Sequence, residues 1–505
     1  MSCIGGLSFV ILLVIVNQAA EIVADTSAGA ELSLCLIYMG ICVVTILCKN
    51  YTMNKALLMA EEVVRRVRVR LVDKLRHTEL QFMERTKKGE IFARIVQDTD
   101  FISQASPGFV NALDAAVSCL AVFIYIAFIS MTGFVLALLS IVTMYFVSFF
   151  SYYEIKEELM AARLKEADFF DSLNDMLTGF KEIKINAKKN NALFADIETL
   201  ARESENVKIE AETRYDRNIV FFFGLFMTVL AVIVFVVPLF TPIHGESLVK
   251  VVAAVLFILG MLVIVYRGIY TIVKANVAVE NLERLEAGID VFGIHTEAAA
   301  VAPGSFREIA FHSVTFQYTG KEEETLFTMG PIDLNIRQGE ILFIIGGNGS
   351  GKSTLLKLLT GLYYPMAGGE ITLDDQSLAR KNYQTYRELF STIFTDFHLF
   401  RKLYGLESVD ERHIAHFLKE MDIHKKTDYV DGEFSKTDLS TGQRKRLAYI
   451  AAILEDKPVY VFDEWAADQD PTFKRHFYEK FLKDLRSGGK TVIAVTHDDR
   501  YFDKA

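Results

Sequence analysis

A glycine-rich segment that ends in a lysine and a serine is the part of this sequence best suited to bind a nucleotide. The segment runs from Gly346 to Ser353 and directly follows an apolar run. Glycines let several backbone N–H groups turn toward phosphate oxygens, and a helix that begins here adds the positive end of its dipole. Lys352 is expected to bridge the β- and γ-phosphates, and Ser353 is expected to ligate Mg²⁺. The predicted nucleotide-binding residues of this loop are Gly346, Gly347, Asn348, Gly349, Ser350, Gly351, Lys352, Ser353 and Thr354.

Two adjacent carboxylates supply the groups that ATP hydrolysis would need. Asp463 and Glu464 follow the apolar run 459–462. We expect Asp463 to hold the same Mg²⁺ through water, and Glu464 to act as the general base that orients and deprotonates the attacking water. His497 follows the apolar run 491–495 and is expected to donate a hydrogen bond to the γ-phosphate, although a lone histidine at a strand end is usually structural. The predicted catalytic residues are therefore Glu464, His497 and Lys352.

A second nucleotide-contacting motif, Leu439 to Gln443, precedes these acids by about twenty residues. This motif cannot reach the phosphates that its own chain's loop would hold. It therefore indicates that two copies of the nucleotide domain close on ATP.

The elements that position these residues follow from the pattern of apolar residues. Continuous apolar runs separated by a helical pattern indicate a mainly parallel α/β core, with an antiparallel portion at its start. The predicted strands are 309–318, 341–345, 459–462 and 491–495, and the predicted helix after the loop is 353–362.

Long uncharged segments fill the first half of the chain. No Asp, Glu, Lys or Arg occurs from Ala115 to Tyr153. This run is longer than one bilayer crossing, so we interpret it as two helices that turn near Ser130 to Gly133. The six predicted membrane spans are residues 2–20, 32–48, 109–130, 133–153, 219–240 and 248–270. The alternatives are buried helices of a soluble domain for the shorter runs and a signal peptide for the first run, although no Lys or Arg precedes it.

Two long charged segments separate these spans and set their orientation. Residues 49–108 hold twelve Lys and Arg and residues 154–217 hold eleven, whereas the turns on the other side hold none. By the positive-inside rule, both segments and the C-terminal domain are expected to lie in the cytoplasm. The membrane that holds the spans is expected to be the inner, cytoplasmic membrane. Both segments are expected to be helical extensions of the spans, each with a break and a short crosswise helix, at 87–90 and at 178–180.

The sequence divides into three predicted parts. Residues 1–285 form a membrane domain made of helices, residues 286–305 are a linker rich in small residues, and residues 306–505 form the nucleotide-binding domain. The cysteines suggest neither a disulfide framework nor a metal site. The net charge of −10 and the lack of a basic patch argue against nucleic acid as a partner.

In their order and spacing, these motifs resemble an ATP-binding cassette. Together with six spans and two long cytoplasmic extensions, nearly the whole chain is similar to a half-transporter of the type I (type IV in newer naming) ABC exporters. The resemblance implies that Tyr318 stacks on adenine, that Ser440 and Gly442 contact the γ-phosphate held by a second copy, and that Asp470 communicates between the two sites. Gln443 is counted with these nucleotide-binding residues. A chain with one cassette must pair, most simply as a homodimer in a lipid bilayer.

Three departures from the family pattern stand out. Thr395 occupies the position of the usual glutamine that links Mg²⁺ to the membrane domain, and its side chain is too short for the same reach, so we regard it as a doubtful metal ligand. Thr441 stands where glycine is usual, which is tolerable if its side chain points away from the nucleotide. The stretch Trp465 to Pro471 replaces the common Pro-Thr-Ser-Ala-Leu-Asp.

This last stretch, with Phe397 to Phe400 and Ala93-Arg94, resembles the cyclic-peptide and siderophore-peptide exporters, which include the pyoverdine, syringomycin and microcin exporters. The resemblance implies ATP-driven export of a peptide natural product, with a lipid or hydrophobic-drug exporter and a membrane-anchored regulatory ATPase as alternatives. Asp114 and Asn111 share one face near the inner end of the third span, where the carboxylate either marks a site or caps the helix at the interface. Compared with the family both ends are short, and either is a candidate fragment boundary.

Overall fold

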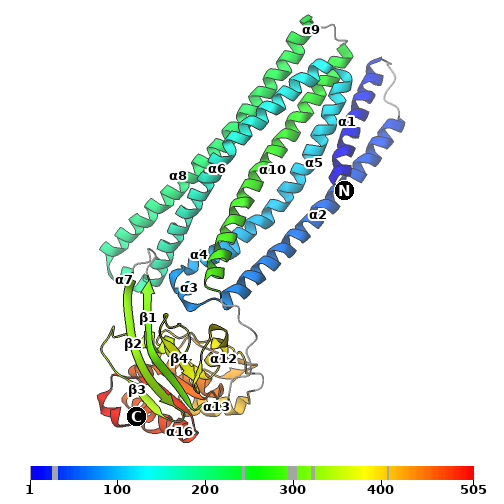
Figure 1. Cartoon of the computed structure of the whole chain (residues 1–505). Coiled ribbons are helices and arrows are strands. Elements are labelled where there is room, and N and C mark those ends of the chain that lie inside the picture. The colour runs from blue at the N-terminus through cyan, green and yellow to red at the C-terminus, as the bar shows by residue number, and fades with distance from the viewer. Residues whose placement is uncertain are drawn as a thin grey trace. The chain divides into compact units, whose positions relative to one another are not determined.

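The computed structural model describes residues 2–25, 32–240, 245–293, 304–319, 325–406 and 409–504. The chain forms two compact units, shown with their elements in Figure 1. The helical unit comprises residues 1–76 and 86–291, and the nucleotide unit comprises residues 77–85 and 292–505.

Long helices make up the helical unit. Six helical segments of the described chain are long and apolar enough to cross a membrane, which confirms the predicted six spans. The long helices are α1 (Ser2–Asp25), α2 (Leu32–Arg76), α5 (Thr99–Ile129), α6 (Met131–Thr178), α8 (Ala187–Ala231) and α10 (Gly245–Val291). The shorter elements are α4 (Lys88–Phe92), η1 (Ala93–Asp98), α7 (Phe180–Ile185), η2 (Val232–Val236) and α9 (Val237–Phe240).

The breaks between these helices have local causes. Ser130 ends α5, and its Oγ accepts a hydrogen bond from the N–H of Gly133 at 3.2 Å, so the predicted turn between spans three and four is confirmed. α6 ends before Gly179, and the short α7 follows, as predicted. Asn186 Oδ1 then caps α8 by accepting from the N–H of Lys189 at 3.1 Å. At Ser130 and at Asn186 a side chain therefore satisfies a free helix end.

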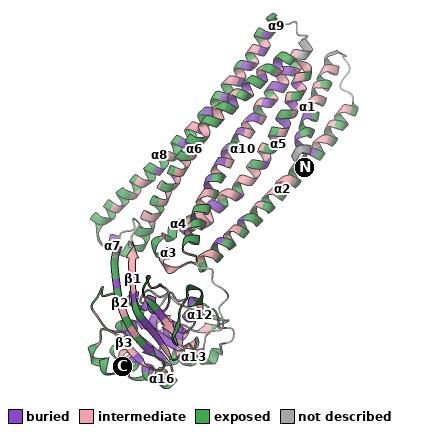
Figure 2. Ribbon diagram, viewed as in Figure 1, coloured by how far each residue is buried: buried purple, intermediate pink, exposed green. Residues whose placement is uncertain are grey.

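Apolar residues cover the outer surface of the helical unit. Phe128 in α5 is 87% exposed, and Phe235 and Leu36 are also exposed. Figure 2 shows exposed residues along the whole length of the long helices, their apolar parts included. Such a surface is stable only in contact with lipid, because water would penalise each of these side chains. The chain is accordingly a multi-pass membrane protein.

Two four-stranded sheets and one two-stranded sheet lie in the described part of the nucleotide unit. The parallel sheet has the order β3 (Ile341–Ile344), β10 (Thr491–Val495), β9 (Val459–Asp463), β6 (Phe390–Ile393). The antiparallel sheet has the order β2 (Thr325–Arg337), β1 (Glu308–Thr319), β4 (Glu370–Leu373), β5 (Gln376–Ser377), and β7 (Tyr429–Val430) pairs with β8 (Glu433–Phe434). The predicted α/β core with an antiparallel portion is confirmed.

Helices cover this core, and every residue of β9 and β10 is buried. The α-helices of the nucleotide unit are α3 (Leu80–Arg85), α11 (Lys352–Leu359), α12 (Tyr383–Arg387), α13 (Glu411–Glu420), α14 (Thr441–Leu454), α15 (Pro471–His476) and α16 (Leu482–Ser487). The 3-10 helices are η3 (Arg380–Asn382), η4 (Trp465–Asp468) and η6 (Asp499–Lys504), and η5 (Phe477–Phe481) is a π-helix.

One short segment belongs to a different unit from the helices that precede and follow it in the sequence. Residues 77–85, which include α3, fold with the nucleotide unit although they fall inside the predicted membrane domain 1–285. Thr78 forms an isolated bridge with Gly293, and the rings of Phe82 and Phe292 lie 6.0 Å apart. α10 also continues to Val291, so the first residues of the predicted linker 286–305 are helical, whereas residues 294–303 lie outside the described residues.

Candidate nucleotide site

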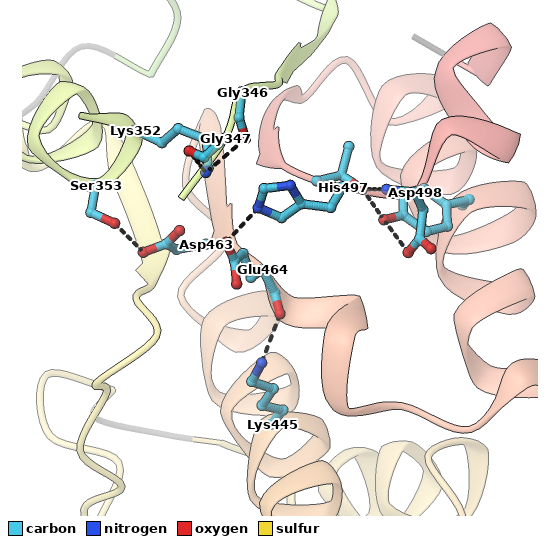
Figure 3. A network of polar contacts seen from close by, with 11 residues as sticks. Gly346, Gly347, Lys352, Ser353, Lys445, Asp463, Glu464, His497 and Asp498 are labelled. Atoms are coloured by element: carbon cyan, nitrogen blue, oxygen red, sulfur yellow. Dashed lines mark hydrogen bonds and ion pairs between the residues drawn. The ribbon is translucent and has the colours of Figure 1, made fainter. Parts of the chain in front are cut away.

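The order of the parallel strands brings the predicted catalytic segments together. β3, β10 and β9 are neighbours in one sheet, and the register pairs Val495 with both Ile344 and Asp463. Their carboxyl ends therefore meet at one edge, where polar ligands bind in open α/β sheets. The glycine-rich loop, the acidic pair and His497 all lie at this edge, as Figure 3 shows.

The glycine-rich loop owes its path to two glycines with left-handed backbone angles. Gly349 has φ +78° and Gly351 has φ +95°, conformations that other residues adopt at a cost. A side chain at Gly351 would also come within 3.0 Å of Met329 Sδ. α11 starts at Lys352, so the loop ends at a helix N-terminus with free backbone donors.

Lys352 lies across the loop that precedes it. Its ammonium group donates to the carbonyl oxygens of Gly346, at 3.0 Å, and Gly347, at 2.9 Å (Figure 3). The positive charge is thereby held at the centre of the loop. A phosphate oxygen at this point would meet both the charge and the backbone donors.

The Ser353 hydroxyl and the Asp463 carboxylate face each other from the start of α11 and the end of β9. Ser353 Oγ lies 3.3 Å from Asp463 Oδ2. Asp463 is only 3% exposed, and at this depth a carboxylate needs a partner. One hydroxyl and one carboxylate, both oxygen donors, suit Mg²⁺, which typically takes one or two protein ligands and completes its shell with phosphate and water. The donor set therefore fits the predicted metal.

Glu464 and His497 form the second pair at this edge. His497 Nε2 lies 3.0 Å from Glu464 Oε1. Glu464 has φ +51°, a backbone conformation that turns the chain sharply after β9 and separates its side chain from that of Asp463. The structure thus brings two of the three predicted catalytic residues into contact, with the carboxylate facing the cavity beside the loop.

A cavity of about 370 Å³ adjoins the loop. Its lining residues are Tyr318, Phe327, Asn348, Gly349, Gly351, Lys352, Ser353, Thr354 and Glu464. Tyr318 in β1 and Phe327 in β2 are cross-strand partners. The cavity therefore combines two aromatic side chains with phosphate-binding groups, an arrangement suited to a nucleotide. The sequence prediction missed Phe327, whose only signal was its position in a second strand.

The second nucleotide motif lies at the start of α14. Gln443 Oε1 accepts from the backbone N–H of Ser440 at 3.3 Å, so its side chain closes the helix end. A side chain at Gly442 would come within 2.7 Å of the carbonyl oxygen of Asp468, so this close approach requires glycine. Thr441 is exposed. Among the described residues that line the 370 Å³ cavity, none belongs to this motif.

Asp470 links the same helix to the segment after the catalytic acids. It accepts from Arg446 at 2.6 Å and from the backbone N–H groups of Thr472 and Phe473. The N–H of Phe473 and the Arg446 guanidinium hold the pKa of Asp470 below its ordinary value. Asp470 therefore stays ionised and caps α15 while it holds α14.

Lys445 is a residue that the sequence prediction missed. It is 2% exposed, and its ammonium group donates to the carbonyl oxygen of Glu464 at 2.7 Å and pairs with Asp468 Oδ2 at 2.6 Å. A signal was present in the sequence, since Lys445 lies four residues before Tyr449 and seven before Ala452 on the apolar face of a helix.

Two further predicted positions lie outside this network. Thr395 is exposed in the turn after β6, and the role of its hydroxyl toward a metal stays a prediction. Asp114 and Asn111 line a separate cavity of about 140 Å³ in the helical unit, together with Thr45 and Lys49. Asp114 lies inside α5, far from both ends of that helix, so the predicted helix cap is wrong, and the role of Asp114 as a site stays a prediction.

Comparisons with protein families match both halves of the chain. Residues 1–265 match the family model described as the ABC transporter transmembrane region, and residues 329–467 match that of the ABC transporter.

Similar proteins include the ATP-binding protein SyrD of Pseudomonas syringae pv. syringae, which is 29% identical over 99% of this chain and 90% of its own length. The energy-coupling factor transporter ATP-binding protein EcfA1 of Staphylococcus aureus (strain USA300) is 28% identical over 38% of this chain and 72% of its own length. A solved structure of a bacterial Atm1-family ABC exporter with ATP bound shares the fold, with a TM-score of 0.81, 17% identity, and coverage of 99% of this chain and 90% of that one.

Proposed function

Because this chain belongs to the ABC transporters, a family of ATP-driven membrane transporters, we propose that it exports a peptide natural product across the cytoplasmic membrane as a homodimer. The observation that supports a dimer is that the motif at Ser440 and the glycine-rich loop do not line the same cavity. Ser440 and Gly442 do not line the cavity that holds Lys352 and Glu464. A second copy, related by a two-fold axis, would supply the missing half of each site.

In this proposal the loop from Gly346 to Thr354 binds the phosphates and Tyr318 stacks on the adenine. Ser353 and Asp463 hold Mg²⁺, which when bound neutralises charge on the β- and γ-phosphates. Ser440 and Gly442 of the second copy close on the γ-phosphate. The free energy of this closure favours the state in which the two cassettes meet, and alternating access requires such a difference between states.

Hydrolysis then depends on Glu464 and His497. Glu464 accepts a proton from the attacking water and orients that water toward the γ-phosphate. His497 Nε2 lies within hydrogen-bond distance of the Glu464 carboxylate and fixes its direction. Loss of the γ-phosphate removes the group that both copies share, so the cassettes separate and the cycle resets.

A peptide substrate is favoured over other cargo by two segments of the cassette. The stretch Trp465 to Pro471 and the segment Phe397 to Phe400 carry the resemblance to peptide exporters. The largely apolar cavity at Asp114 and Asn111 also holds Lys49, so it presents charged groups of both signs to such a peptide inside the membrane domain.

Transport into inverted membrane vesicles tests this proposal directly. Vesicles that contain the chain should accumulate a fluorescent cyclic lipopeptide when ATP and Mg²⁺ are present, and vesicles with Glu464→Gln should not. A fluorescent phospholipid offered in parallel distinguishes a lipid exporter. ATP hydrolysis without accumulation of either probe would contradict export and favour the regulatory ATPase.

A further inference from the structure

One carboxylate of the short helix α3 accepts two hydrogen bonds from the nucleotide unit. Glu84 in α3 accepts hydrogen bonds from Tyr363 Oη at 2.5 Å and from Lys357 Nζ at 2.7 Å. Tyr363 follows α11, the helix that begins at Lys352. In the sequence, Glu84 precedes Tyr363 by 279 positions, so only folding brings them together.

Tyr363 also contacts the aromatic residue of the nucleotide cavity. Its hydroxyl lies 2.9 Å from that of Tyr318, and its ring stacks on Phe316 at 4.5 Å between centroids. Tyr363 is 0% exposed. Burial, together with the neighbouring Glu84 carboxylate, raises the pKa of Tyr363 well above its ordinary value, so the hydroxyl keeps its proton.

The number of hydroxyl protons decides which group donates in each of these hydrogen bonds. The Glu84 carboxylate is the acceptor in both of its bonds, so Tyr363 uses its single proton in the bond to Glu84. The Tyr363 oxygen must then accept from the hydroxyl of Tyr318. Tyr318 in turn can accept from Thr354, whose Oγ1 lies 3.4 Å away. Each hydroxyl is therefore oriented by the next, as in other buried polar chains.

We propose that Tyr363 is a positioning residue that transmits adenine binding at Tyr318 to Glu84, and through it to α3. This inference depends on the proposed function only in assigning the adenine to Tyr318. A base that stacks on Tyr318 fixes the ring and its hydroxyl, and hence the bond to Tyr363. α3 is covalently joined to α2 and α4, which end at Arg76 and begin at Lys88. A change in the position or order of α3 therefore reaches the membrane helices.

Because Thr395 stands in place of glutamine, a connection from Tyr318 to α3 would give this chain another link between the nucleotide and the membrane helices. Thr395 is exposed in a turn, and its side chain has the reach of one hydroxyl. The bonds from Tyr318 through Tyr363 to Glu84 do not pass through that turn. They begin at Tyr318, the residue proposed to stack on the base of the nucleotide.

Other contacts hold α3 in place independently. Glu79 pairs with Arg380 at 3.3 Å, and Phe82 packs on Phe292. Lys357 retains its bond to Glu84 if the Tyr363 hydroxyl is removed. The substitution Tyr363→Phe should therefore disconnect α3 from Tyr318 without releasing α3 from the nucleotide unit.

Hydrogen–deuterium exchange of the full chain in lipid nanodiscs tests this proposal. The probes are a Mg²⁺-bound, non-hydrolysable ATP analogue and Mg²⁺-bound tripolyphosphate, which lacks the base. In the unmodified protein the analogue should slow exchange in α3 about fivefold, the factor that corresponds to one ordinary hydrogen bond, and tripolyphosphate should not. Tyr363→Phe should abolish the response at saturating analogue, and Glu84→Gln, which keeps an acceptor oxygen, should preserve part of it.

Tyr386→Phe is the matched control. Tyr386 is also buried, and its hydroxyl donates to the carbonyl oxygen of Leu359 at 2.6 Å without contact to Glu84 or Tyr318. This variant should respond as the unmodified protein does. If Tyr363→Phe does not fold, Glu84→Ala removes the acceptor from a side chain that is 35% exposed, and should also abolish the response.

A response to tripolyphosphate equal to that with the ATP analogue, or an undiminished response in Tyr363→Phe or in Glu84→Ala, would overturn the relay. Vesicles that fail to accumulate any probe would overturn export and leave the exchange result standing, so the two failures are distinguishable.

Discussion

The buried ammonium group of Lys445 donates a 2.7 Å hydrogen bond to the backbone carbonyl oxygen of Glu464. The indole N–H of Trp465 returns a bond to the carbonyl oxygen of Lys445 at 2.8 Å. The helix that presents Ser440 and the turn that presents Glu464 are thus joined twice, once in each direction. Because Glu464 has an unfavourable φ angle, these bonds help to hold the conformation that aims its carboxylate at the loop.

Removing the ammonium group of Lys445 should slow hydrolysis and leave ATP binding nearly unchanged. Lys445→Met keeps the length of the side chain and loses the contacts of the ammonium group with the Glu464 carbonyl oxygen and with Asp468, so Glu464 should move relative to the attacking water. A displacement of about 1 Å can cost roughly 100-fold in rate. Steady-state ATPase assays should therefore show a lower kcat with a similar KM.

Lys480→Gln is the control for this prediction. Lys480 pairs with Glu420 at 2.7 Å on the surface of the same unit and does not contact Glu464. It should retain full activity. An unchanged kcat in Lys445→Met would show that the turn holds Glu464 without help from the Lys445 ammonium group.

Replacing the predicted general base should separate binding from turnover. In Glu464→Gln the amide oxygen can still accept from His497, but the side chain no longer takes a proton from water. General-base catalysis is typically worth roughly 100- to 10,000-fold, so turnover should fall by a factor in that range. Equilibrium binding of labelled ATP should remain. Hydrolysis at the original rate would remove Glu464 from the role of base.

The Ser353 hydroxyl should set the Mg²⁺ requirement. Ser353→Ala loses one predicted oxygen ligand beside Asp463, and we expect the Mg²⁺ concentration for half-maximal ATPase activity to rise about tenfold. Excess Mg²⁺ should restore most of the turnover, and EDTA should stop it in both proteins. An identical Mg²⁺ dependence in the variant would place the metal elsewhere.

Gly268 should be required for close packing in the helical unit. A side chain at Gly268 in α10 would come within 2.1 Å of Ala112 Cβ in α5, so Gly268→Ala must push the two helices apart. Overpacking of this kind typically costs about 1–3 kcal/mol. Thermal unfolding in nanodiscs should show a lower Tm.

Gly260→Ala provides the comparison on the same helix. Among the described residues, no atom other than those of the two chain neighbours and the backbone of α10 lies within 4 Å of a side chain built at Gly260, so this variant should unfold at the original temperature or slightly above it. Equal Tm values for the two variants would mean that α5 and α10 separate in the membrane-embedded protein.

The sequence alone determined the features that depend on neighbouring residues. The loop from Gly346 to Thr354 was predictable because its chemistry lies in consecutive residues between a strand and a helix. The six spans were predictable because lipid leaves no partner for free backbone groups, so each crossing must be a long apolar helix. Asp463 and Glu464 were predictable because polar residues at the ends of parallel strands meet at one edge.

Only the tertiary structure decided which distant residues share one environment. Phe327 reaches the cavity through its pairing with Tyr318, and Lys445 reaches Glu464 through the packing of α14. The segment 77–85 lies within the predicted membrane domain, yet its Glu84 binds Tyr363. A hydrogen bond depends on a separation of about 3 Å, and spacing in the sequence sets such a separation only within a single helix, strand or turn.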